Sequence, residues 1–217
     1  MTWSNDHLAY DWFHRDLPRN IEMGPNVYIE SSYVFAAFFS EMRPALIMEE
    51  GSGAYDLSAI VTGPRGRISI GAFTCLNSTT LVCEQKISIG AHCLFAWGTV
   101  VTDGVLPTPG EVEPRRHAMS ETGADPIRRL RPMSKIKPVT IGDNVWIGFD
   151  SVAAGGVEIG RGAIIGCKTL ITENIPAYAV VVGNPCRILR FLEPDDTEDA
   201  RTAALREFGV SPEAIRV

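Results

Sequence analysis

An apolar residue that recurs every six positions constrains this chain more than any other feature. From position 141 onward, the first phase of the repeat consists of Ile141, Ile147, Ala153, Ile159, Ile165 and Ile171. A second phase is small or β-branched and consists of Val145, Ser151, Val157, Ala163, Thr169 and Ile175. A helix repeats about every 3.6 residues and a strand about every 2, so this period fits neither as a continuous element. It predicts short strands joined by corners around a coil, with the leading apolar residue pointing inward.

The same period appears in earlier parts of the chain. Three more triplets of apolar residues lie six apart: Met23, Ile29 and Phe35; Ile70, Leu76 and Val82; Ile89, Phe95 and Val101. Between 40 and 68 the register is blurred, so the repeat does not place the corners there. Repeats that stack on one another bury a continuous core. We therefore expect one parallel β-helix over about 20–180, with the isoleucines of the repeat inside.

The run IGDNVWIG, followed by GVEIGRGAIIGCKTLITENIPAYAVVVGNPCRILR, resembles the hexapeptide-repeat acyltransferases and is similar to sugar and xenobiotic O-acetyltransferases. The resemblance is closest over 139–190. It implies an all-β fold, a left-handed parallel β-helix in which three hexads make one triangular coil, and a homotrimer. The handedness comes from the resemblance alone, because parallel crossovers are otherwise almost always right-handed. We expect a β-helix domain at 21–190, preceded by an N-terminal segment at 1–20.

Two segments depart from the repeat. The excursion loop 104–138 is far longer than an ordinary connection, which favours a functional role. It carries seven Lys or Arg residues and four Asp or Glu residues in a protein whose formal net charge is −6. The C-terminal segment 191–217 is predicted to be helical, with an acidic start at 195–199, a helix over 200–208 and Gly209 as its stop. Such a helix would cover the exposed end of the coils.

Composition excludes several partners. The acidic balance argues against nucleic-acid binding. The longest apolar runs, such as 34–39, are too short to span a membrane, and the first residues lack the pattern of a signal peptide. The five cysteines are odd in number and form no Cys-x-x-Cys pair. They favour a reducing cytoplasm and roles as small core or corner residues.

The resemblance implies acetyl-CoA, or another acyl-CoA, as co-substrate in a groove between subunits. The cofactor-binding residues that it implies are Trp146, Phe149, Cys167, Lys168, Thr172, Arg187 and Arg190. A lysine is common in the family where Glu173 stands, and either Lys168 or the basic excursion supplies that charge here. Trp146 has a second interpretation as subunit packing, and Arg187 and Arg190 have one as a solvated edge.

The catalytic base of the resembling family is a histidine whose expected position falls near Leu106, so this chain departs from the pattern there. A base must take a proton from the acceptor as it attacks the thioester. The remaining candidates are His117, Asp103 and Glu84. Glu84 and Trp97 are candidates for binding the acceptor. Trp97 could equally fill an interface, and a lone loop histidine such as His117 is often only solvated.

Two functions from different classes follow. The first is an acyl-CoA-dependent O- or N-acyltransferase, in the simplest case an acetyltransferase, acting on a small hydroxyl or amine compound. The alternative is a catalytically silent hexapeptide-repeat trimer that serves as a binding or assembly module, which the missing histidine favours. No metal is expected, because a zinc site of the γ-carbonic anhydrase type needs three histidines and only His92 and His117 lie in or near the coils.

Overall fold

The computed structural model describes residues 7–8, 10–105, 111–125 and 135–192. The helix predicted at 200–208, Gly209 as its stop and Leu106 lie outside the described residues. So do Arg128, Arg129 and Arg131 of the basic excursion. Among the residues that are described, no helix is long and apolar enough to cross a membrane.

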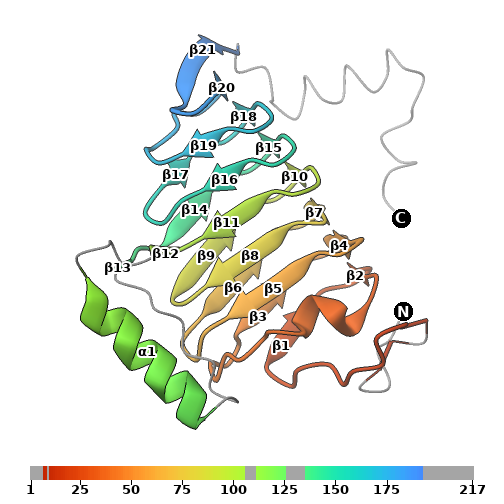
Figure 1. The fold of residues 1–217 in the computed structure, drawn as a ribbon. Coiled ribbons are helices and arrows are strands. Elements are labelled where there is room, and N and C mark those ends of the chain that lie inside the picture. The colour runs from red at the N-terminus through yellow and green to blue at the C-terminus, as the bar shows by residue number, and fades with distance from the viewer. Residues whose placement is uncertain (1–6, 9, 106–110, 126–134, 193–217) are drawn as a thin grey trace.

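Three sheets of short strands form the walls of a triangular coil (Figure 1). Sheet A contains β1 (Ile21–Met23), β3 (Leu46–Met48), β6 (Arg67–Ile70), β9 (Lys86–Ile89), β14 (Val139–Ile141) and β17 (Glu158–Ile159). Sheet B contains β2 (Tyr28–Ile29), β4 (Gly53–Tyr55), β7 (Cys75–Asn77), β10 (Leu94–Phe95), β15 (Trp146–Ile147), β18 (Ile164–Ile165), β20 (Ala179–Val182) and β21 (Arg187–Phe191). Sheet C contains β5 (Ala59–Thr62), β8 (Thr80–Cys83), β11 (Val100–Thr102), β16 (Val152–Ala153) and β19 (Leu170–Ile171).

Successive strands pass from sheet A to B to C, and each coil pairs in parallel with the next. In sheet B, for example, Phe95 pairs with Leu76 below it and with Ile147 above it. The first coil replaces its sheet C strand by the short 3-10 helix η1 (Ser32–Phe35). At the other end β21 turns back antiparallel to β20 and closes sheet B. The predicted parallel β-helix is therefore confirmed.

The interior of the coils is built from the first phase of the repeat. All six of its members from Ile141 to Ile171 are buried, and so are all six of the second phase at the corners. Ile29, Phe35, Ile89, Phe95 and Val101 are buried as predicted from the earlier triplets. Burying these side chains against one another stabilises the coils, at roughly 25 cal/mol for each Å² of apolar surface removed from water.

The structure completes the prediction for the earlier coils in one place and corrects it in another. The stretch between 40 and 68, where the repeat does not place the corners, contains a complete coil with Met48, Ala54 and Ile60 buried six positions apart. The prediction that Val82 points inward is wrong. The turn between β7 and β8 is one residue shorter, so Leu81 and Cys83 are buried and Val82 faces outward. In a strand, a shift by one residue exchanges the two faces.

The excursion contains regular secondary structure. Its root is the antiparallel pair β12 (Gly104–Val105) and β13 (Lys135–Ile136), and it contains the helix α1 (Val112–Ala124), which the sequence analysis missed. The helix lies to the side of the coils (Figure 1). Of its thirteen residues, all described, Ala118 alone is buried.

Candidate functional site

The turns that lead from sheet B to sheet C form an exposed edge of the coils, which we call the B–C corner. Trp97 and Phe149 occupy equivalent places in successive turns and are 49% and 45% exposed. Their rings stack, with centroids 5.5 Å apart and planes 14° from parallel. Cys167 follows in the next turn and is also exposed. The candidates Trp97, Phe149 and Cys167 therefore share one edge of the molecule.

Hydrogen bonds hold this edge in place. The indole Nε1 of Trp97 donates to Asp56 Oδ2 over 2.7 Å, a contact that fixes the ring against the corner two coils below. The N–H of Asp150 donates to the carbonyl of Trp97 and that of Lys168 to the carbonyl of Phe149, over 3.0 and 2.7 Å. Asp150 and Lys168 both adopt φ +55°, a left-handed conformation that lets the chain turn the corner. Asp56 is a positioning residue that sequence reasoning missed.

The remaining cofactor candidates lie at the upper end of the coils. Thr172 is exposed in the turn that follows β19. Cys186 Sγ lies 3.8 Å from Glu173 Oε1, which places the start of β21, and with it Arg187, beside that turn. Arg190 pairs with Val180 in sheet B, in the same cross-strand row as Trp146. All seven cofactor candidates are thus at the B–C corner, on sheet B or at the upper end.

The turns that lead from sheet C to sheet A form a second edge, the C–A corner, and two catalytic candidates lie there. Asp103 is fully buried. Its Oδ1 accepts a hydrogen bond from the N–H of Glu84, and its Oδ2 accepts from the N–H groups of Gln85 and Lys86, all at 2.7 to 2.8 Å. A carboxylate occupied in this way holds the turn and has no access to an acceptor. We therefore assign Asp103 a structural role in place of the catalytic one predicted from the sequence.

Cys83 packs beside this carboxylate and is not a nucleophile. Its Sγ lies 3.6 Å from Asp103 Oδ2. Burial, reinforced by the negative charge of Asp103, raises the pKa of the Cys83 thiol far above its ordinary value. The thiolate, which is the reactive form, is thereby suppressed.

The other two catalytic candidates are accessible. Glu84 is half-buried, and a β-carbon at Gly63 would overlap its carboxylate, which places that carboxylate over the neighbouring turn. His117 is exposed on α1. Within the described chain, no hydrogen bond joins His117 to Glu84.

The two edges are separated by the width of sheet C. In one coil, Trp97 precedes β11 and Asp103 follows it, so the strand lies between them. The predicted acceptor-binding pair, Trp97 and Glu84, is therefore not brought together within one chain. A site that used both edges would need two copies of the molecule, with the B–C corner of one facing the C–A corner of another.

Comparison with known proteins identifies the repeat. The family model "Bacterial transferase hexapeptide (six repeats)" matches residues 138–173. The chain carries the bacterial transferase hexapeptide repeat. The coils share the left-handed parallel β-helix fold of the solved acyltransferase structures described next, as the resemblance implied.

Two solved structures and one curated relative give the extent of the likeness. A hexapeptide-repeat acetyltransferase from Vibrio cholerae complexed with acetyl coenzyme A is 25% identical, with a TM-score of 0.53, over 69% of this chain and 72% of that one. A mutant of AntD, an N-acyltransferase from Bacillus cereus, in complex with dTDP and coenzyme A, shares the fold at 16% identity, with a TM-score of 0.59 over 86% and 89% of the two chains.

The curated relative is 2,3,4,5-tetrahydropyridine-2,6-dicarboxylate N-acetyltransferase of Staphylococcus aureus. It is 42% identical over 71 residues, which are 32% of this chain and 30% of that protein. The chain spans about a third of the length of the curated relatives that it matches. This sequence likeness therefore concerns one segment of each protein.

Sequence reasoning also missed a group of cations on sheet A. Arg67 and Lys86 begin β6 and β9 and face each other in register. Their separation of 19 positions would have revealed the pair if successive coils had been aligned. No group of three or more His, Cys, Asp or Glu side chains in the described parts of the chain is placed to hold a metal ion.

Proposed function

We propose that this hexapeptide-repeat protein is an acyltransferase that moves an acyl group, in the simplest case acetyl, from coenzyme A to a hydroxyl or amine of a small molecule. The observation that carries the proposal is the likeness to the acetyl coenzyme A complex from Vibrio cholerae over 69% of this chain. The repeat at 138–173 includes five of the seven cofactor candidates, from Trp146 to Thr172.

In the proposed reaction the acceptor oxygen or nitrogen attacks the carbonyl carbon of the thioester. A bond forms to that carbon, the carbon–sulfur bond breaks, and coenzyme A leaves as a thiol. A base must remove the proton of the acceptor, and general-base catalysis contributes roughly 10² to 10⁴-fold. We assign this role to His117, with Glu84 as the group that orients the acceptor. Asp103 is not needed, because its oxygens already hold the turn at 84–86.

We propose that the active form is a homotrimer with its clefts between copies. The outer side of sheet B supports this proposal, because Tyr28, Leu94 and Trp146 are 37%, 44% and 38% exposed along one face. Exposed apolar surface of this kind marks an interaction site. A closed ring also brings the B–C corner of one copy to a second edge of the next, which a single chain does not do.

We propose a cytoplasmic location, with a small-molecule acceptor and with neither nucleic acid nor membrane as partner. All five cysteines are free thiols, which is the usual state in a reducing compartment. The formal net charge of −6 supports the exclusion of nucleic acid.

The first experiment is isothermal titration with acetyl-CoA and desulfo-CoA, together with an assay for free thiol release across a panel of amines and sugars. We expect saturable binding of both cofactors and thiol release with some acceptors. Sedimentation should give a mass three times that of the chain. An intact trimer that binds neither cofactor would favour the assembly module instead.

The second experiment tests His117. We expect His117→Ala to lower turnover about 10²-fold and to leave the affinity for acetyl-CoA unchanged. His14→Asn is the matched control, because His14 is also exposed and its φ of 55° is one that asparagine tolerates. If His117→Ala keeps full turnover while Glu84→Gln loses it, the carboxylate is the base.

A further inference from the structure

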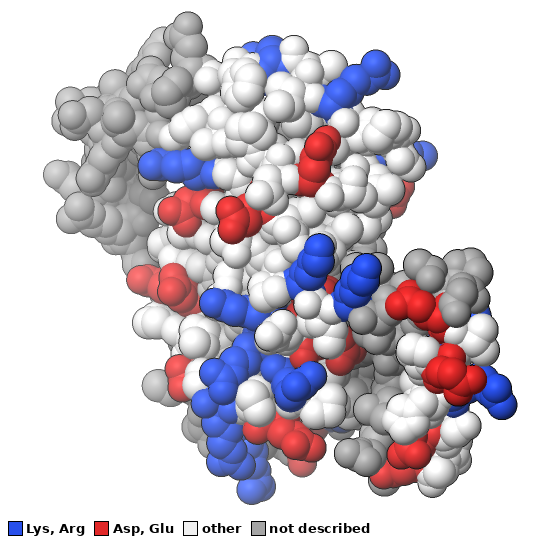
Figure 2. Space-filling model, turned by 90° about the vertical axis from the view of Figure 1, so that its left-hand side faces the viewer, with Lys and Arg blue, Asp and Glu red and all other residues white. Residues whose placement is uncertain are grey.

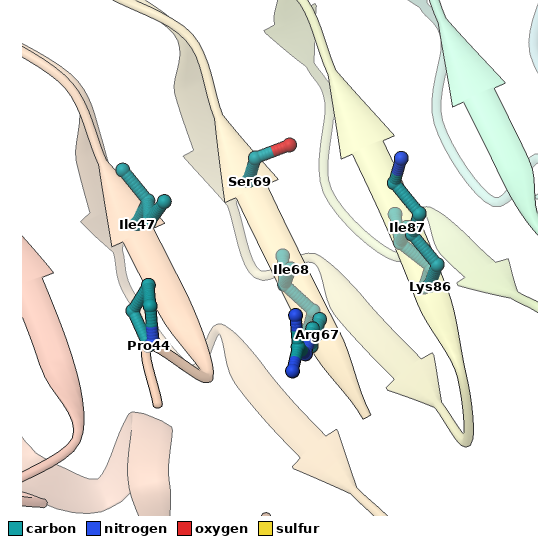
Figure 3. Close-up of a pocket in the computed structure, with 7 residues that line it drawn as sticks. All are labelled: Pro44, Ile47, Arg67, Ile68, Ser69, Lys86 and Ile87. Carbon is teal, nitrogen blue, oxygen red and sulfur yellow. The ribbon is translucent and has the colours of Figure 1, made fainter. Parts of the chain in front are cut away.

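The outer side of sheet A contains a hollow that the proposed reaction does not use. It lies over β3, β6 and β9 and is lined by Pro44, Ile47, Arg67, Ser69 and Lys86, among others (Figure 3). A second hollow continues from it around the C–A corner, shares Arg67 and Lys86, and adds Arg65. The two hollows form one surface with three cations, which we call the sheet A hollow.

Among the described residues, the cations of this surface have no acidic partner. Arg65, Arg67 and Lys86 are exposed, and none of them forms an ion pair with any residue that the structure describes. The nearest acceptor of Arg67 is the weak one of Met42 Sδ, 3.4 Å from Nη2. Figure 2 shows Lys and Arg side chains gathered over the lower coils. The formal net charge of the chain is −6, so the charge of this surface is opposite in sign to that of the whole chain.

The register of β6 and β9 places two positive charges at opposite positions, which is destabilising when no anion is bound. Arg67 and Lys86 occupy directly opposite positions on neighbouring parallel strands. Like charges that face each other across a pair of strands are destabilising. An anion bound in the hollow would lower this repulsion by adding a negative charge near both side chains. The hollow therefore favours a bound oxyanion.

We propose that the sheet A hollow binds a phosphate-bearing small molecule. The guanidinium of Arg67 presents a planar fork that matches two phosphate oxygens, and the ammonium of Lys86 adds a compact charge. The hydroxyl of Ser69, in the same hollow, is a further donor. Pro44 and Ile47 form an apolar wall beside the cations, suited to the organic part of the ligand (Figure 3).

Within one chain, this site lies apart from the aromatic candidates of the proposed cofactor groove. The aromatic candidates of that groove lie at the B–C corner, and sheet A is the wall of the triangle that does not touch that corner. The hollow adjoins the turn at 84–86, which Asp103 holds rigid through three hydrogen bonds. The inference stands on these residues and does not require acyl transfer to occur.

The test is isothermal titration of the full chain with inorganic phosphate and with phenyl phosphate. We expect one saturable site per chain, with phenyl phosphate bound more tightly because its ring has the apolar wall to rest on. Arg67→Gln and Lys86→Gln should each weaken binding about tenfold, as the loss of one charge-assisted contact predicts. Ile47→Thr should remove the preference for phenyl phosphate and leave inorganic phosphate unaffected.

Arg161→Gln is the matched control, because Arg161 is an exposed arginine in another part of sheet A's edge, beside Tyr178. Equal weakening by Arg161→Gln would show that only net charge matters and would overturn the site. Absence of saturable binding would overturn it as well. Competition with coenzyme A distinguishes a separate phosphate site from a part of the cofactor groove. If coenzyme A displaces phenyl phosphate, the hollow belongs to the cofactor and the separate site is wrong.

Discussion

The coils and the helix α1 belong to one chain but are stabilised in different ways. In the coils, each inward side chain is covered by the coil above and the coil below, as Phe95 is by Leu76 and Ile147. In α1, whose residues are all described, Ala118 alone is buried. A helix of thirteen residues is near the length at which isolated helices are only marginally stable. We infer that the coils determine the free energy of unfolding of the molecule. The stability of α1 depends instead on the surface against which it packs.

The largest effect should come from the interior of the coils. Phe95 is fully buried, and Phe95→Ala removes a ring from a closed core, so we expect a loss of about 3–5 kcal/mol in the free energy of unfolding. Met119 on α1 is 65% exposed, and Met119→Ala should change that free energy by less than about 0.5 kcal/mol.

Denaturant titration of both variants at one protein concentration measures the difference, since assembly would couple stability to concentration. A large loss with Met119→Ala would break the comparison, because it would mean that α1 is packed against another surface in solution.

The next effect should come from the C–A corner, where the excursion leaves the coils. Asp103→Asn replaces a carboxylate that accepts three N–H hydrogen bonds by a group with one acceptor oxygen. We expect a loss of about 2–3 kcal/mol in the free energy of unfolding, because one partly buried N–H loses the charged oxygen that it bonds. Thermal unfolding measures it. Unchanged stability combined with lost turnover would instead return Asp103 to the catalytic residues.

A smaller effect should come from a corner of the coils. Gly162 has φ +66°, and a β-carbon there would lie 2.6 Å from the ring of Tyr178. Gly162→Ala should therefore lower the free energy of unfolding by about 1–2 kcal/mol, through strain in the left-handed conformation and displacement of the ring. The double variant Gly162→Ala with Tyr178→Ala, compared with Tyr178→Ala alone, separates the two causes, since that difference retains only the strain.

The smallest effect should have the opposite sign. Gly123 lies within α1, and a β-carbon there would meet nothing within 4 Å. Gly123→Ala should stabilise the helix by about 0.5 kcal/mol, because alanine loses less conformational freedom. Circular dichroism of the two proteins would register a gain in helical signal. A loss would show that glycine is required at 123 by a surface of another molecule.

Sequence reasoning predicted the coils well because their cause is local. Each inward residue of the repeat from Ile141 to Ile171 is set by a six-residue unit that buries the same side chain at every turn. The prediction of inward residues was wrong where the repeat unit is one residue shorter. Val82 was expected inside, but the shorter turn before β8 placed Leu81 there instead. Similarly, α1 was missed because a helix exposed on nearly every side has no apolar periodicity to reveal it.

The candidate site was predicted only as a set of residues. Phe149 and Cys167, which the resemblance implied, occupy successive corners 18 positions apart, and Trp97 stacks on Phe149 from the coil below. The role of Asp103 could not be read in the same way. Its three partners are backbone N–H groups of a turn some 17 to 19 positions earlier, and side-chain identity carries no record of such contacts.

The sequence by itself determined the repeat, the inward residues wherever the six-residue period is kept, and the separation of the coils from the excursion, because these follow from a period that can be read directly in the sequence. Tertiary structure decided which residues became neighbours across coils. Arg67 faces Lys86, and Asp103 meets the turn at 84–86, because coils of unequal length still stack in register. Stacking satisfies the backbone hydrogen bonds of every strand, and this requirement, rather than any side-chain preference, fixes what lies opposite what.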